Sequence, residues 1–212
     1  MKIEQNAPVP ISVILDKMKF KIESGALSIK DIKSIQHNGL KQYLSIRGIP
    51  IETARKCLKE LYIYNKNSKK HFYALGFKND DDGYFIQNHV FTGFIGDRAT
   101  TFIRGTNPKP AGIHIFRETM DYMSIVSRSE NGQFKYDSIV LNALSCLQQA
   151  KAYIQNYGYR IIHTWLDNGK NGRAATQDLE SFLKAENIHH RPMNYIYKNF
   201  RDANSWHVKN IR

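Results

Sequence analysis

The 212-residue sequence predicts two structural units. The first is an α+β unit with an antiparallel sheet, and the second is an α/β unit in which helices flank a parallel sheet. Residues 71–103 contain short apolar and aromatic runs between turn residues, as is typical of antiparallel strands. From residue 112 onward, apolar strand-like runs alternate with helical patterns, which favours parallel strands joined by right-handed crossovers. Two prolines within residues 106–110 indicate a linker, so we predict a basic N-terminal unit at 1–105 and a second unit at 111–212.

The first unit is predicted to begin with helices and to continue with strands. Apolar residues at roughly helical spacing predict a helix within the first 24 residues: Val13, Ile14, Met18 and Ile22. A short turn is expected at 29–33. Two helices are expected at 42–48 and 50–62, with Pro50 at the start of the second. The strands of one antiparallel sheet are expected at 72–77, 84–87, 90–95 and 100–103.

The second unit is predicted to place two carboxylates at the ends of neighbouring strands. Strands are expected at 113–116, 138–141 and 161–166, and helices at 118–128, 146–157 and 173–186. Glu118 and Asp167 each follow a strand and precede a helix. Open α/β sheets bind ligands at this edge, and hard cations prefer oxygen ligands, so the two acids could share one divalent ion. Alternatively, each acid only faces a helix dipole.

Four motifs in the second unit occur in an order that resembles a known family. They are Glu118-Thr119-Met120-Asp121, Val140-Leu141-Asn142-Ala143, Leu166-Asp167-Asn168-Gly169-Lys170-Asn171-Gly172 and Arg201-Asp202-Ala203-Asn204-Ser205-Trp206. Together they are similar to the Toprim domain shared by topoisomerases and bacterial primases, and most similar to primase-like proteins of mobile elements. The resemblance covers about residues 112–208 and extends more weakly over 43–101. It implies a Toprim-like fold for the second unit.

The resemblance also implies a site, and the departures from the family pattern weaken it. Glu118 and Asp167 are the expected catalytic residues, and Asp202 joins them as a candidate metal ligand. The second acid of the family's Asp-x-Asp motif is replaced by Gly169. Thr119 stands where the family has glycine, and Ser205 stands where it has an acid. Because magnesium is usually held by carboxylates, water and phosphate, we expect magnesium binding to be weak or absent.

Basic residues near the acids are candidates for nucleic-acid binding. Lys170 and Arg173 flank the acidic turn, and Arg201 lies in the last motif. Arginine offers a planar donor fork to phosphate and lysine a point charge. Asp121 lies one turn after Glu118, so it either supports the site or lies on the helix surface.

Three other polar positions have simpler interpretations. The alternative for Asp202 is an ion pair with Lys198 or Arg201. His163 is expected to pack within its strand, and His189-His190 to lie in a solvated loop.

The charge of the chain favours an anionic partner. Its net charge is +12, and the first 110 residues hold 18 basic and 10 acidic residues. Nucleic-acid binding is the favoured explanation, and a merely soluble basic surface is the alternative. The sequence has no apolar run of transmembrane length and no convincing signal peptide, so a cytoplasmic protein without a membrane partner is expected. Cys57 and Cys146 are too far apart in the sequence to suggest a disulfide framework or a zinc site.

The family resemblance implies a DNA-processing protein of a bacterial mobile element. We expect primase-like ancestry and a degenerate metal site. We also expect the chain to bind nucleic acid, most of all DNA, which could be single-stranded. One alternative is an active magnesium-dependent primase or Toprim nuclease. Another is a protein-interaction module of a mobilisation complex, with replication or mobilisation proteins as partners.

Overall fold

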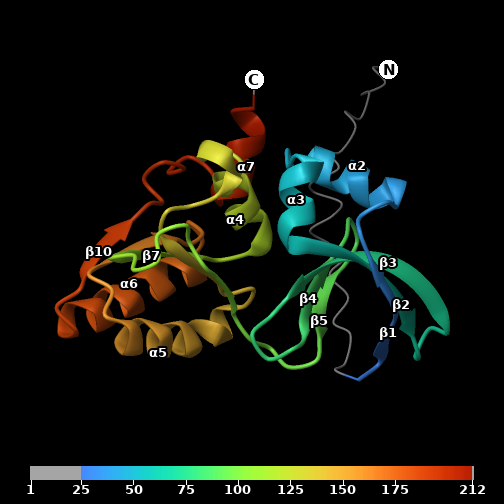
Figure 1. The fold of residues 1–212 in the computed structure, drawn as a ribbon, viewed down its shortest axis with the longest axis horizontal. Coiled ribbons are helices and arrows are strands. Elements are labelled where there is room, and N and C mark those ends of the chain that lie inside the picture. Colours follow the sequence, from blue (N-terminus) through green and yellow to red (C-terminus); the bar gives the residue numbers. More distant parts are fainter. Residues whose placement is uncertain (1–24, 212) are drawn as a thin grey trace, which may run out of the picture.

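The computed structural model describes residues 25–211 and contains two five-stranded sheets, one in each half of the chain (Figure 1). The strand order is β1-β2-β3-β4-β5 in the first sheet and β10-β9-β7-β8-β6 in the second. The helix expected within residues 1–24 lies outside the described residues.

The first sheet is antiparallel throughout, which confirms the prediction. Its strands are β1 (Leu27–Lys33), β2 (Leu58–Asn65), β3 (Lys70–Lys78), β4 (Tyr84–Gln87) and β5 (Thr92–Ile95). The prediction of a turn at 29–33 is wrong, because these residues belong to β1, which pairs with β2.

Two short helices, α2 (Asn38–Ile46) and α3 (Ile51–Cys57), lie between β1 and β2. Gly48 follows α2 with φ +70°, a left-handed conformation that favours glycine after a helix. The second predicted helix ends earlier than expected, because residues 58–62 extend into β2. The sequence of β2, LKELYIYN, is rich in aromatic and β-branched residues after its first three positions, and such residues favour a strand.

The second sheet is mixed. Its strands are β6 (Thr101–Ile103), β7 (Gly112–Phe116), β8 (Asp137–Val140), β9 (Ile161–Trp165) and β10 (His189–Pro192). The parallel arrangement is confirmed for β10, β9, β7 and β8, whereas β6 pairs antiparallel with β8. Residues 100–103 were therefore assigned to the wrong sheet. The domain limits 1–105 and 111–212 stay a prediction.

Helices cover both faces of the second sheet. On one face lie α5 (Leu147–Tyr157) and α6 (Lys170–Ala185), and on the other α4 (Thr119–Val126) and α7 (Ala203–Lys209) (Figure 1). Short 3-10 turns are found at Glu130–Gly132 and Leu144–Cys146. Side chains alternate across the sheet, so Ile113 and Ile115 of β7 pack in the core with α5 and α6, and Phe116 points to the α4 side.

The core on the α4 side is shared between the two halves. Phe116, Tyr122 and Trp165 belong to the same apolar cluster as Leu44 and Phe77 from the first half. The edge of the second sheet that carries Glu118 and Asp167, called here the acidic edge, is thus built on a core that includes both halves. No helix of the described residues is both long and apolar enough to cross a membrane.

Candidate functional site

Glu118 and Asp167 lie at the same edge of the second sheet. The neighbouring parallel strands β7 and β9 are in register at Phe116 and Trp165, and the backbone N–H of Arg117 donates to the carbonyl of Trp165 at 3.2 Å. Glu118 is the N-cap residue of α4, but its side chain makes no capping hydrogen bond. Its carboxylate therefore remains available for other contacts.

Arg117 lies between the two acids. Its Nη1 is 3.2 Å from Glu118 Oε1, and its Nε is 3.6 Å from Asp167 Oδ2. The side chains of Arg117 and Asp167 are only 21% and 17% exposed, whereas Glu118 is 43% exposed. These contacts are ion pairs without aligned hydrogen bonds, since buried Nε and Nη1 have no hydrogen-bond partner. A guanidinium thus supplies the positive charge between the acids, where a metal ion would compete with it.

Arg117 was not among the predicted site residues. The available signal was a basic residue directly before Glu118 at a strand end.

Two glycines shape the turn after β9. Gly169 is the N-cap residue of α6, and its N–H donates to Asp167 Oδ1 at 3.1 Å. A Cβ on Gly172 would lie 2.1 Å from both the backbone oxygen and Oδ1 of Asp167. Only glycine fits there, so the first turn of α6 packs directly against Asp167.

Asp121 is fully buried rather than on the helix surface. Its Oδ1 accepts a hydrogen bond from the backbone N–H of Asn204 at 3.0 Å. Burial raises its pKa well above the usual value, and the nearby carboxylates of Asp202 and Glu118 raise it further. Glu118 and Asp202 are therefore close enough to act on the buried carboxyl group of Asp121.

Asn204 joins the two halves of the chain behind the acidic edge. Its Nδ2 donates to the Arg47 carbonyl at 2.9 Å and to Ser124 Oγ at 2.8 Å, and its Oδ1 accepts from Arg47 Nη1 at 2.9 Å. Asp202 caps α7 by accepting from the Ser205 N–H at 2.7 Å. The last motif thus has a structural role in this chain. The part that Asn204 plays in it was not predicted from the sequence.

The predicted ligand set does not form a three-residue metal site. Among residues 25–211, no three His, Cys, Asp or Glu side chains are grouped so that they could hold an ion. Glu118 and Asp167 face the same guanidinium, whereas Asp202 caps a helix. Metal binding by Glu118 and Asp167 stays a prediction.

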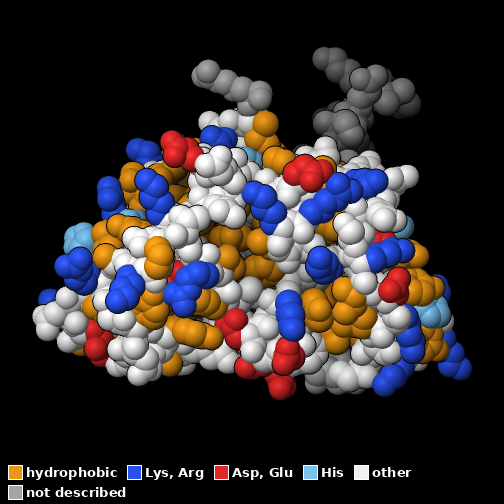
Figure 2. All heavy atoms as spheres, viewed as in Figure 1, with side chains coloured by type: hydrophobic (Ala, Val, Ile, Leu, Met, Phe, Trp, Pro, Cys, Tyr) orange, Lys and Arg blue, Asp and Glu red, His pale blue; other side chains and the backbone are white. Residues whose placement is uncertain are grey.

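The three predicted nucleic-acid-binding residues surround the acidic turn. Lys170 and Arg173 are exposed at the start of α6, and Arg173 Nη1 donates to the Asn168 carbonyl. The Arg201 carbonyl accepts from the Asn168 N–H at 2.7 Å, which brings the segment before α7 against this turn. Figure 2 shows further Lys and Arg side chains spread over both halves on the displayed face.

The histidines have structural positions. His163 in β9 is 8% exposed and lies 4.8 Å from the ring of His114 in β7. Burial and the neighbouring His163 lower the pKa of His114 to about 3. His189 and His190 belong to the edge strand β10, so the loop expected there is wrong.

Comparison with known proteins supports the fold. A family model described as a domain of unknown function (DUF8464) matches residues 29–96. No curated protein matches the sequence. The structure is similar to the primase fragment of the bacteriophage T7 primase-helicase protein, with a TM-score of 0.56, 16% identity, and coverage of 86% of this chain and 77% of that one. The chain has a primase-like fold.

A second bacteriophage T7 structure also matches. In it, the lagging-strand DNA polymerase interacts with primase domains of two gp4 subunits bound to an RNA/DNA hybrid and dTTP. The TM-score is 0.52 at 15% identity, and the match covers 78% of this chain and 84% of the other.

Proposed function

We propose that this chain is a DNA-processing protein of a bacterial mobile element that binds nucleic acid through a Toprim-like second unit with a degenerate metal site. The observation that carries this proposal is the acidic edge itself. Glu118 and Asp167 share one guanidinium, and Gly169 stands where a second acid would be needed. Primase-like ancestry rests on the fold and on the order of the four motifs.

Nucleic acid is the partner that the charges fit. The chain carries a net charge of +12, and lysine and arginine side chains bind phosphate by releasing counterions. Lys170 and Arg173 lie within one turn of the acidic loop, at the start of a helix whose dipole also favours anions. The primase domains of the second T7 structure are bound to an RNA/DNA hybrid, which is consistent with a nucleic-acid partner here.

Magnesium would be held weakly, if it is held, by Glu118 and Asp167. When bound, such an ion neutralises charge on phosphate. Two carboxylates with an arginine already between them provide fewer ligands than two-metal phosphoryl transfer requires. We therefore propose that the chain binds nucleic acid with little or no polymerase activity. An active primase or nuclease is the second candidate, because both strand-end acids are retained.

A binding titration tests the proposal. The full chain is titrated onto fluorescein-labelled single- and double-stranded oligonucleotides, and anisotropy is measured at about 50 and 200 mM salt. Binding should weaken steeply with salt, and Lys170→Ala/Arg173→Ala should weaken it more than Lys66→Ala/Lys70→Ala, a pair with the same charge loss in the β2–β3 hairpin. No binding of the native chain at low salt would contradict the proposal and favour a protein-interaction module.

A further inference from the structure

A hollow with two basic residues lies at the edge of the second sheet opposite Glu118 and Asp167. Strands β7 and β9 begin at this edge and end two residues before Glu118 and Asp167. Each strand has five residues, so the two edges lie roughly 16 Å apart. The hollow has a volume of about 420 Å³ and is lined by Lys109, Pro110, Ala111, Tyr157, Gly158 and Arg160.

Two of the lining residues carry positive charge that no carboxylate neutralises. Lys109 and Arg160 are exposed, and neither makes an ion pair with any residue of the described part of the chain. Arg104 nearby differs, because its Nη1 lies 3.0 Å from Asp137 Oδ2. The hollow therefore has two free cations of the types that bind phosphate.

The hollow also has an aromatic wall. Tyr157 is 40% exposed and stacks on Tyr159, with ring centroids 4.2 Å apart and planes at 17°. Exposed aromatic rings of this kind stack nucleobases of any sequence.

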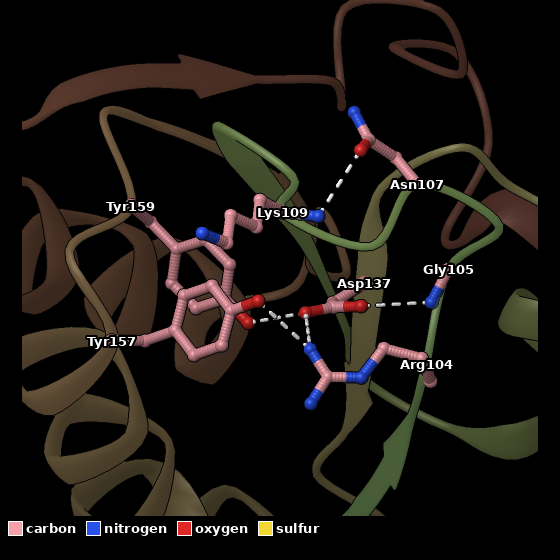
Figure 3. A network of polar contacts seen from close by, with 7 residues as sticks. All are labelled: Arg104, Gly105, Asn107, Lys109, Asp137, Tyr157 and Tyr159. Carbon is pink, nitrogen blue, oxygen red and sulfur yellow. Dashed lines mark hydrogen bonds and ion pairs between the residues drawn. The ribbon is translucent and has the colours of Figure 1, made fainter.

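A polar network centred on the buried Asp137 holds this wall in place (Figure 3). Asp137, which is completely buried, accepts from Tyr159 Oη at 2.6 Å, from the Gly105 N–H at 2.8 Å and from Arg104 Nη1 at 3.0 Å. Arg104 Nη1 also donates to Tyr157 Oη at 2.9 Å. The exposed ring is thus fixed before any ligand arrives, which lowers the entropy cost of binding.

Acidic residues limit the site on the other side of Tyr157. Tyr157 also lines a neighbouring hollow of about 500 Å³, which contains Asp80 and Asp81. These carboxylates repel phosphate, so a nucleic-acid backbone fits only on the side of Lys109 and Arg160.

We propose that this hollow binds single-stranded nucleic acid, with a phosphate between Lys109 and Arg160 and the adjacent base stacked on Tyr157. This inference rests on the proposed function and adds a second contact with the strand, on the sheet edge opposite Glu118 and Asp167. Phosphate and base face are common to DNA and RNA, so both are tested.

The test separates the ionic contact from the stacking contact. Labelled oligo-dT and oligo-U of about 16 nucleotides are titrated with the full chain at several salt concentrations. For Lys109→Ala/Arg160→Ala, the slope of log K against log salt should become shallower by about 1.4, because two phosphate contacts on a single strand are lost. Lys66→Ala/Lys70→Ala, with the same charge loss, should keep the native slope.

The aromatic wall is tested by two changes of one residue. Tyr157→Leu should weaken binding roughly tenfold with the salt slope unchanged, because it removes a stacked base but no phosphate contact. Tyr157→Phe keeps the ring and should bind within about twofold of the native chain. Thermal melting of each variant shows whether it is folded before binding is compared.

Each outcome supports or overturns the inference. If the native chain binds but Lys109→Ala/Arg160→Ala retains the salt slope of the control pair, the inference is wrong and the proposed function stands. If the native chain binds neither oligonucleotide at low salt, the proposed function fails and this inference fails with it. If Lys109→Ala/Arg160→Ala weakens binding to only one of the two oligonucleotides, that oligonucleotide identifies which nucleic acid occupies the hollow, and the inference is supported.

Discussion

Replacing Gly169 with aspartate tests why the acidic site lacks ligands. Gly169 has φ −72° and ψ 171°, a conformation open to any residue. A Cβ here would lie 3.2 Å from Asp167 Oδ1, a tight contact that a small movement of the carboxylate relieves. Gly169→Asp should therefore fold, and it restores the second acid of the Asp-x-Asp pattern.

In the absence of metal, Gly169→Asp should be less stable than the native chain. Two carboxylates about 4 Å apart repel by about 1 kcal/mol in bulk water and by about 4 kcal/mol near a protein surface. Arg117 beside Asp167 reduces this repulsion, and aspartate is only about 0.3 kcal/mol better than glycine as an N-cap. We expect a net loss of about 1–2 kcal/mol, which lowers the Tm of a chain of this size by about 2–8 °C.

Manganese should reverse this loss in Gly169→Asp. An ion at one hundred times its Kd stabilises the folded state by about 2.7 kcal/mol, which raises the Tm by about 5–11 °C. The assay is thermal unfolding followed by circular dichroism, with and without manganese. Gly169→Asn has the same size without the charge and should show neither effect. An equal gain in Tm with manganese in the native chain would show that Gly169 does not weaken metal binding.

Three further changes test the packing around the site. Asp121→Asn should flatten the pH dependence of stability. Because the pKa of Asp121 is raised in the folded chain, the folded state keeps a proton that the unfolded state releases above about pH 4. The free energy of unfolding of the native chain therefore falls by up to about 1.4 kcal/mol per pH unit between about pH 4 and the raised pKa. Urea unfolding across pH 4–8 measures this, and an unchanged slope in the variant would contradict it. Gly172→Ala should lower the free energy of unfolding by about 1–3 kcal/mol, because the added Cβ meets Asp167. Gly39→Ala in α2 is the control: its Cβ meets only a side chain, so melting curves should show that it is tolerated. Asn204→Ala leaves buried partners unsatisfied and should cost about 2–4 kcal/mol in the same urea assay; a loss below about 1 kcal/mol would mean that its hydrogen bonds are not important.

The α/β alternation was predictable for β7, β8 and β9, because each is a short apolar run followed by a helix, whereas the short β6 and the polar β10 were not recognised as strands of this sheet. β7, β8 and β9 accordingly lie within one residue of their expected positions. β2 was misread because Leu58 and Leu61 fit a helical spacing as well as a strand. Only pairing with β1 and β3 decides between the two, and that pairing is not local in sequence.

The strand-end acids were predictable for the same reason, because position relative to a strand is a local property. Arg117 and Asn204 were missed because their roles depend on distant partners. Arg117 contacts Asp167 across the sheet edge, and Asn204 contacts Arg47 from the other half of the chain. The burial of Asp121 likewise depends on α7 packing over α4, and the helical spacing of Glu118 and Asp121 could not show this.

Primer synthesis on a single-stranded DNA template tests whether the acidic edge is catalytically active. The native chain is incubated with template, ribonucleotides and magnesium or manganese, and a parallel gel shift shows whether the template is bound. We expect a bound template and no oligoribonucleotide product above the blank without protein. Products that form with the native chain and disappear in Glu118→Gln would contradict it, and would show that the acidic edge is an active catalytic site.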